Sequence, residues 1–126
     1  MEIKRPEIAH EDERGRIIDV MEALEFNYAT VITSRKGVTR GNHYHRKTTQ
    51  WVYLLRGRML AHSRMPNATQ ERAVLEQGDL LKNPPFEQHA LTALEDSEFL
   101  VLTAGLRGGK DYEKDTYRLD KPMQDE

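Results

Sequence analysis

Apolar and polar residues alternate along most of this chain, in short stretches that end at turn-forming residues. A period of two is typical of strands, because successive side chains of a strand point to opposite faces of a sheet. The expected strands span residues 16–22, 28–33, 39–45, 50–55, 59–65, 70–75, 80–81, 87–94 and 98–104. Roughly eight or nine short strands at a spacing of roughly ten residues predict an all-β sandwich or barrel.

Two segments depart from this pattern. Residues 6–14 are expected to contain a turn of helix. Residues 51–55 are apolar throughout. A continuous apolar run indicates a strand buried on both faces, either inside the sandwich or at a dimer contact. We expect a single domain, with the barrel at about residues 16–104, an N-terminal arm at 1–15 and a C-terminal extension at 105–126.

Composition narrows the class of protein. The chain has 126 residues, of which 37% are hydrophobic and 32% charged, and its formal net charge is −2. This charge gives no reason to expect nucleic acid or an anionic membrane as a partner. No apolar run approaches the roughly 20 residues that span a bilayer, and there is no signal-peptide core or cysteine. We therefore expect a soluble, cytoplasmic protein.

The candidate chemistry is concentrated in residues 37–57. His43 and His45 are two positions apart, so in a strand they point to the same face. The next strand follows after a short turn and brings Gln50 back toward the pair. This pattern predicts a compact polar cluster on β-structure that is able to bind a metal or to move a proton.

The spacing of these residues resembles a known pattern of two motifs. The residues concerned are Gly37-x5-His43-x-His45-x4-Gln50-x6-Gly57 and Gly78-x5-Pro84-x4-His89. They resemble the two motifs of the cupin superfamily, which implies a jelly-roll β-barrel with the three histidines gathered inside. The chain departs from the cupin pattern at Gln50, where the family has Glu, at Phe86, where it has Gly, and at Ala93, where it has Asn.

A metal site is one of two interpretations of the cluster. His43, His45, Gln50 and His89 would be its ligands, and the candidate divalent ions are Zn, Fe, Ni and Mn. Imidazole nitrogens suit Zn, Cu, Fe and Ni. Because Gln50 stands where the family has glutamate, the positive charge of such an ion would not be compensated, and the affinity of the site for metal would be lower. The other interpretation is a polar cavity that holds no metal.

A finer resemblance concerns enzymes of sugar nucleotides. Residues 40–44, Arg-Gly-Asn-His-Tyr, are similar to the Arg-Gly-x-His-Tyr motif of dTDP-4-dehydrorhamnose 3,5-epimerases, in which the histidine removes a proton next to a ketone. Residues 12–15 resemble their Asp-x-Arg-Gly segment, whose arginine helps to hold the nucleotide sugar. Residues 112–118 resemble the Tyr-x-x-x-Asp-Tyr-x-Arg ending of dTDP-sugar 3,4-ketoisomerases, which also carry a His-x-His pair.

This resemblance implies an isomerase or epimerase acting on a 4-keto-6-deoxy sugar nucleotide. It implies His43 and His45 as the residues that transfer the proton. The candidates for substrate binding are Arg14, Arg40, Tyr44, Gln50 and His89. Two alternatives stay open: a metal-binding cupin of other chemistry, such as a dioxygenase or a metal-assisted isomerase, and a carbohydrate-binding cupin without catalysis.

Other residues receive structural interpretations. Tyr112 and Asp115 are expected to form a clasp at the rim of the barrel, and His10 and His62 are expected at the surface. Open sheet edges invite pairing between chains, and many cupins exchange strands, so we expect a homodimer.

Overall fold

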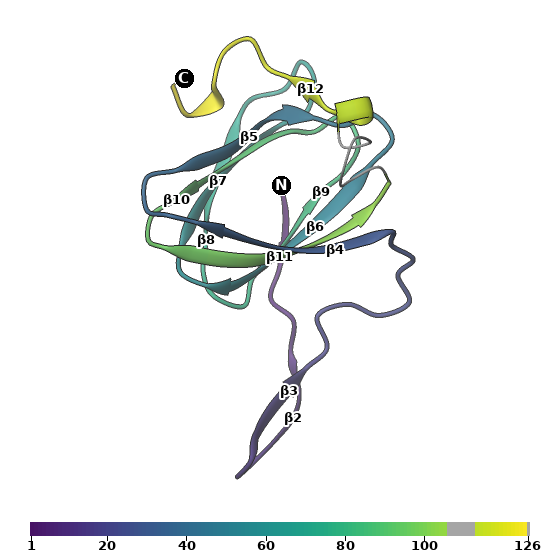
Figure 1. Cartoon of the computed structure of the whole chain (residues 1–126), viewed down its shortest axis with the longest axis vertical. Coiled ribbons are helices and arrows are strands. Elements are labelled where there is room, and N and C mark those ends of the chain that lie inside the picture. The colour runs from purple at the N-terminus through teal and green to yellow at the C-terminus, as the bar shows by residue number, and fades with distance from the viewer. Residues whose placement is uncertain (106–112, 126) are drawn as a thin grey trace.

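Two antiparallel sheets face each other and enclose the interior of the molecule (Figure 1). The computed structural model describes residues 1–105 and 113–125. The first sheet has the order β1 (Glu2–Lys4), β9 (Leu80–Asn83), β6 (Thr49–Arg56), β11 (Ser97–Ala104) and β4 (Tyr28–Ser34). The second has the order β12 (Tyr117–Arg118), β5 (Thr39–Tyr44), β10 (Gln88–Ala93), β7 (Met59–Arg64) and β8 (Glu71–Leu75). The predicted all-β class is confirmed.

The hydrophobic core lies between the two sheets. Val52 and Leu54 of β6 alternate with half-buried residues and point inward, where they meet Phe99 and Val101 of β11. Leu54 has no exposed surface. Full burial of a leucine side chain adds roughly 1.5–3 kcal/mol to the free energy of unfolding. Because the outward residues of the 51–55 run are only half-buried, its interpretation as a strand inside the sandwich is wrong. The dimer-contact alternative stays a prediction.

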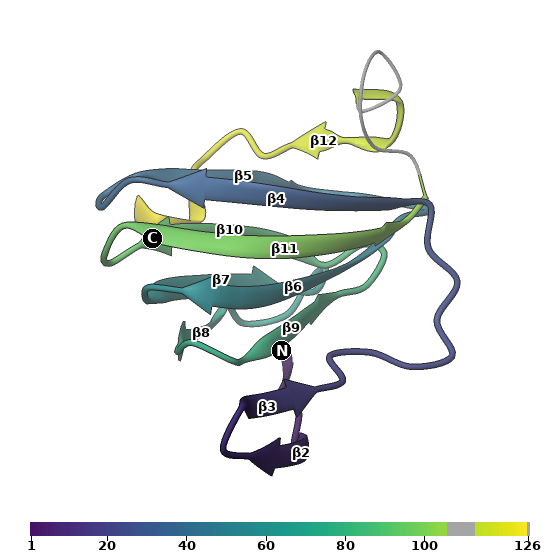
Figure 2. The same cartoon turned by 60° about the horizontal axis from the view of Figure 1, so that its bottom comes forward.

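A hairpin projects away from the barrel near the N-terminus. It consists of β2 (Ile8–Asp12) and β3 (Gly15–Ile18), and Figures 1 and 2 show it hanging below the two sheets. The expected turn of helix at residues 6–14 is therefore wrong, and the strand expected at 16–22 ends at Ile18. Ile8 and Ile17 are 45% and 57% exposed on this hairpin.

The C-terminal segment covers the outer face of the second sheet. The side chain of Met123, in the 3-10 helix η2 (Met123–Asp125), is fully buried. His62 of β7 is buried as well, and its Nδ1 lies 3.0 Å from Oε1 of Gln70, whose amide nitrogen donates to the carbonyl oxygen of Met123. The surface position expected for His62 is therefore wrong, whereas that of His10 is confirmed.

None of the helical segments within residues 1–105 and 113–125 has the length and hydrophobicity that crossing a membrane requires.

Candidate functional site

A bulge in β5 determines how the first histidine faces the cavity. His43 pairs with His89 of β10, but the next pair joins Gly41 to Ala90, so Asn42 is an extra residue in β5. Asn42 has a φ of 57° and Gly41 a φ of 100°. A Cβ atom at Gly41 would lie 2.8 Å from the carbonyl oxygen of His89, so only glycine permits this close approach of the strands. The bulge places His43 directly opposite His89.

Three histidines come together inside the barrel. The ring centroids of His43 and His45 are 4.9 Å apart, those of His43 and His89 4.7 Å, and those of His45 and His89 5.4 Å. One nitrogen from each ring lies within 4.8 Å of the others, and all three side chains are buried. The predicted cluster therefore forms, and it includes the histidine of the second motif.

Main-chain carbonyls fix the hydrogen positions on two of the rings. His45 Nδ1 lies 2.7 Å from the carbonyl oxygen of Asp115, and His89 Nδ1 lies 3.0 Å from that of Glu87. A carbonyl oxygen only accepts hydrogen bonds, so each Nδ1 donates and each neutral ring keeps its lone pair on Nε2. Among the described residues, nothing forms a hydrogen bond with the buried Nε2 of His45.

Burial makes His89 a weak base. It lowers the pKa of His89 from 6.5 to about 4, and the adjacent His45 lowers it as well, against the opposing effect of the Glu87 carbonyl. His89 is therefore neutral at physiological pH and offers Nε2 as an acceptor.

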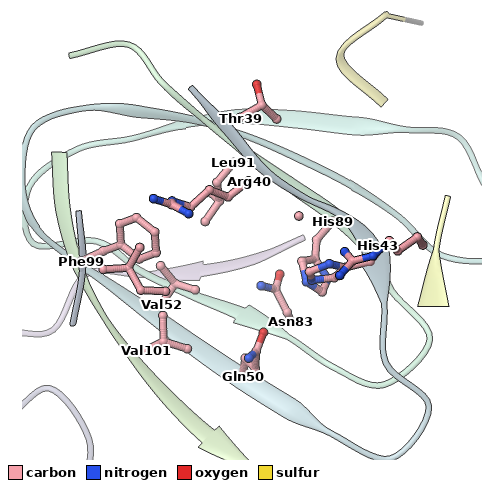
Figure 3. Close-up of a pocket in the computed structure, with 13 residues that line it drawn as sticks. Thr39, Arg40, His43, Gln50, Val52, Asn83, His89, Leu91, Phe99 and Val101 are labelled. Carbon is pink, nitrogen blue, oxygen red and sulfur yellow. The ribbon is translucent and has the colours of Figure 1, made fainter. Parts of the chain in front are cut away.

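A cavity of about 260 Å³ opens beside this cluster. Figure 3 shows His43 and His89 together at one end of it, with Phe99 at the other. The apolar part is formed by Ile32, Val52, Leu91, Phe99 and Val101, and the remaining lining residues are Thr39, Arg40, Gly41, His43, Gln50, Asn83, His89 and Arg118. None of the described lining residues is acidic. The cavity thus suits a neutral or anionic molecule with both polar and apolar parts.

Two carboxamides lie across the cavity from the histidines (Figure 3). Gln50 of β6 is paired in register with Asn83 of β9, and both side chains are buried. The Gln50 amide nitrogen donates to Thr103 Oγ1 over 3.4 Å. The side-chain oxygen of Asn83 has no hydrogen-bond partner among the described residues, so it is left to meet a donor from a ligand or solvent.

Two arginines reach the cavity from different strands. Arg40 donates from Nε to Ser34 Oγ over 2.7 Å and from a terminal nitrogen to the carbonyl oxygen of Thr33 over 2.9 Å. Arg118 of β12 is paired in register with His43, and its guanidinium also forms an ion pair with Glu113. Guanidinium groups bind phosphates through paired hydrogen bonds.

The structure brings some of the predicted site residues together and separates others. His43, Gln50, His89 and Arg40 line the cavity, whereas His45 contacts the other two histidines without lining it.

Two predicted substrate-binding residues do not line this cavity. The ring of Tyr44 stacks on that of Tyr117, with centroids 5.3 Å apart. Arg14 lies on the hairpin in an ion pair with Asp12.

Sequence reasoning missed Asn83 and Arg118. Arg118 could have been found as the last residue of the ketoisomerase-like run at 112–118, whereas only the strand register reveals Asn83. Tyr112, which begins that run, lies outside the described residues.

Comparisons with known proteins agree with this architecture. A family model described as the polysaccharide biosynthesis C-terminal domain matches residues 10–117. None of the curated proteins compared with the chain matches it. The predicted cupin jelly-roll barrel is confirmed by its likeness to solved structures.

Three of these structures illustrate the likeness. A dTDP-4-dehydrorhamnose 3,5-epimerase from Sulfolobus tokodaii is 23% identical, with a TM-score of 0.76, over 97% of this chain and 81% of that one. A sugar 3,4-ketoisomerase from Thermoanaerobacterium thermosaccharolyticum is 19% identical, with a TM-score of 0.77, over 94% of this chain and 88% of the ketoisomerase. A 3,4-ketoisomerase from Helicobacter canadensis is 16% identical, with a TM-score of 0.80, over 94% of this chain and 90% of the ketoisomerase.

Proposed function

This chain belongs to the polysaccharide biosynthesis C-terminal domain family, and we propose that it is an isomerase that moves a proton next to the ketone of a 4-keto-6-deoxy sugar nucleotide. The observation that carries the proposal is the cluster of His43, His45 and His89 at the polar end of the cavity. Similar structures support the substrate class, because one 3,4-ketoisomerase was solved with TDP-4-keto-6-deoxyglucose and one epimerase with dTDP-4-keto-L-rhamnose.

His43 is the proposed base, because it lines the cavity and contacts both other histidines. A proton on the carbon next to a ketone is acidic enough for an imidazole to remove at neutral pH. The electron pair of the broken C–H bond moves into an enolate. Return of the proton to the former carbonyl carbon, together with passage of the hydroxyl hydrogen of the first carbon to the enolate oxygen, gives ketoisomerisation. Return of the proton to the opposite face of the first carbon gives epimerisation. The proposed role of His45 is to exchange the proton with His43, and the contact between the two rings, with centroids 4.9 Å apart, supports it.

The rest of the cavity fits the other parts of such a substrate. A developing enolate oxygen requires a hydrogen-bond donor already in position, and the second hydrogen of the Gln50 amide nitrogen is the proposed donor. The unpaired side-chain oxygen of Asn83 is an acceptor suited to a hydroxyl group of the sugar. Arg118, which is paired in register with His43, and Arg40, whose side chain lies toward the Phe99 end of the cavity (Figure 3), offer guanidinium groups to the anionic part of the substrate. The apolar part around Phe99 is suited to the methyl group of a 6-deoxy sugar.

The proposal is tested by solvent exchange. Incubation of the protein with dTDP-4-keto-6-deoxyglucose in D₂O is expected to place deuterium on a carbon next to the ketone, as read by NMR and mass spectrometry. His43→Asn removes the base, and we expect the exchange rate to fall by about 10²- to 10⁴-fold.

His62→Asn is the matched control, because His62 is a buried histidine on the outer face of the second sheet and does not line the cavity. Its exchange rate should stay close to that of the wild type. Binding of the nucleotide sugar without any exchange in the wild type would contradict the proposal and favour a carbohydrate-binding cupin.

A second candidate, a metal-binding cupin, is favoured by the lone pairs on Nε2 of His45 and His89. One nitrogen of each of the three histidines lies within 4.8 Å of the others, close enough to hold a divalent ion, and Gln50 lines the same cavity. Such an ion would supply a Lewis acid for a carbonyl oxygen. Stoichiometric metal in the untagged protein that is lost in His45→Ala, together with exchange that requires this metal, would favour this candidate.

A further inference from the structure

Asp115 connects the C-terminal segment to the loop that follows His45. It ends the 3-10 turn at residues 113–115 and is buried, although the two preceding residues are exposed. Its carboxylate accepts hydrogen bonds from the backbone nitrogens of Arg46 and Lys47, each over 3.0 Å, and from Thr48 Oγ1 over 2.7 Å. The three donors are consecutive, so the whole β5–β6 loop is fastened to this one side chain.

The carboxylate is a strong anchor because it is ionised. Burial favours the neutral acid, but the hydrogen bonds from Thr48, Arg46 and Lys47 outweigh that effect and hold the pKa of the Asp115 carboxyl below its usual value. Hydrogen bonds to an ionised acceptor are roughly twice as strong as those between neutral groups. The position of the Asp115 backbone is therefore firmly set.

The same residue also contacts the histidine cluster through its main chain. The Asp115 carbonyl oxygen lies 2.7 Å from Nδ1 of His45 and requires a hydrogen on that nitrogen. A free histidine side chain in water prefers its hydrogen on Nε2, so the contact imposes the less common tautomer. The Nε2 atom of His45 then has a lone pair within the cluster.

We propose that Asp115 is a positioning residue whose anchored carbonyl fixes His45 as the Nδ1–H tautomer, with the Nε2 lone pair available inside the histidine cluster. The carboxylate and the carbonyl act together, because the carbonyl stays in place only while the side chain is held by the loop. In the isomerase this keeps His45 ready to accept a proton from His43, a consequence that rests on the proposed function.

The tautomer is measured directly by the ring ¹⁵N chemical shifts of His45 in two-dimensional ¹H–¹⁵N NMR. The full chain is used after treatment with EDTA, at mildly alkaline pH where free histidine is neutral. In the wild type we expect hydrogen on Nδ1. In Thr48→Val and Asp115→Asn, which weaken the anchor, we expect a mixture that contains the Nε2–H form.

Two controls separate this effect from general damage. Thr48→Ser keeps the hydroxyl group and should keep the wild-type tautomer. Asp96→Asn removes a carboxylate that accepts a hydrogen bond from the backbone nitrogen of Lys36 over 2.8 Å. Asp96 lies in the β10–β11 turn, at the other end of β10 from His89. It should leave the His45 shifts unchanged.

The kinetic measurement is solvent exchange on dTDP-4-keto-6-deoxyglucose. Thr48→Val and Asp115→Asn should lower kcat by about 10- to 100-fold, as is typical when a residue behind a reactive group is lost, with KM little changed. Hydrogen on Nε2 in the wild type, or an unchanged Nδ1–H form in both folded variants, would overturn the proposal. Absence of exchange in the wild type would instead contradict the proposed function, and the NMR result would still decide the role of Asp115.

Discussion

The histidines of this chain differ in their chemistry because of what each ring contacts. His45 and His89 donate to main-chain carbonyls inside the barrel, and His62 contacts a side-chain amide beneath the C-terminal segment. His10 lies in solvent beside the carboxylate of Asp12. Residue type alone therefore does not identify the histidines proposed to transfer the proton, whereas the Arg-Gly-x-His-x-His sequence does point to His43 and His45.

His89 should make the stability of the protein depend on pH. Its folded pKa of about 4 lies below the unfolded value of 6.5, so between these values the unfolded chain binds a proton that the folded chain excludes. The free energy of unfolding contributed by His89 is present above the unfolded value and should fall with decreasing pH, by at most about 1.4 kcal/mol per pH unit, until about pH 4. Urea unfolding of the wild type and His89→Gln across this range measures the difference.

His10→Gln is the matched control, because His10 is exposed and lies outside the cluster. The fall in stability that His89 causes between pH 6.5 and about 4 should persist in this variant. A difference between the wild type and His89→Gln that stays constant with pH would show that His89 keeps an ordinary pKa in the folded chain.

At the scale of elements, the turn between β9 and β10 contains a strained residue. Phe86 has a φ of 70°, a conformation that favours glycine, and its side chain is 46% exposed. Its backbone nitrogen donates to the carbonyl oxygen of His45 over 2.6 Å, so the turn must keep this shape. Glycine is the residue that adopts such a φ without a steric penalty.

Glycine at this position should stabilise the fold relative to another small residue. Phe86→Gly and Phe86→Ala both remove the ring, but only glycine adopts the positive φ without a steric penalty. We expect Phe86→Gly to be more stable than Phe86→Ala by about 1 kcal/mol, as measured by urea unfolding. Equal stability of the two variants would mean that the turn relaxes to a negative φ.

Much of the barrel could be predicted from period-two alternation, and the histidine pair from its spacing. The bulge at Asn42 could not, because it depends on the pairing of β5 with β10. The contact between His45 and Asp115 joins residues 70 positions apart through a main-chain atom, which carries no sequence signal. The first strand of the hairpin, β2, could not be predicted either, because the alternation in residues 6–14 is too weak to distinguish a strand from a turn of helix, whereas β3 falls within the strand expected at residues 16–22.

At the scale of the whole molecule, the hairpin and the adjoining sheet present unpaired apolar surface. Ile8 and Ile17 are exposed, and a groove beside the hairpin is lined by Ile8, Tyr53 and Leu55. Isolated hairpins of two strands are marginally stable in water, so this one is expected to pack against a second copy of the chain. Arg14 lies on the same hairpin and does not line the cavity of its own chain, so its part in substrate binding stays a prediction.

We predict a homodimer in solution. Sedimentation of the wild type should give twice the mass of the chain, and Ile17→Asp should shift the protein toward monomer. Val74→Asp is the matched control, because Val74 is also an exposed apolar strand residue but lies on β8, at the edge of the second sheet. A wild type that stays monomeric at all concentrations would contradict this prediction.

The order in which the strands pair has a consequence for synthesis of the protein. His43 meets His89 only after β10 has joined β5, and the carbonyl that holds His45 belongs to residue 115. During synthesis, the growing chain therefore contains two of the three cluster histidines, His43 and His45, before His89 is available to complete the cluster. Pairing of segments so distant in sequence is slow compared with local folding. The cluster is thus among the last features to form, so reactivity would appear only in chains that have completed their fold.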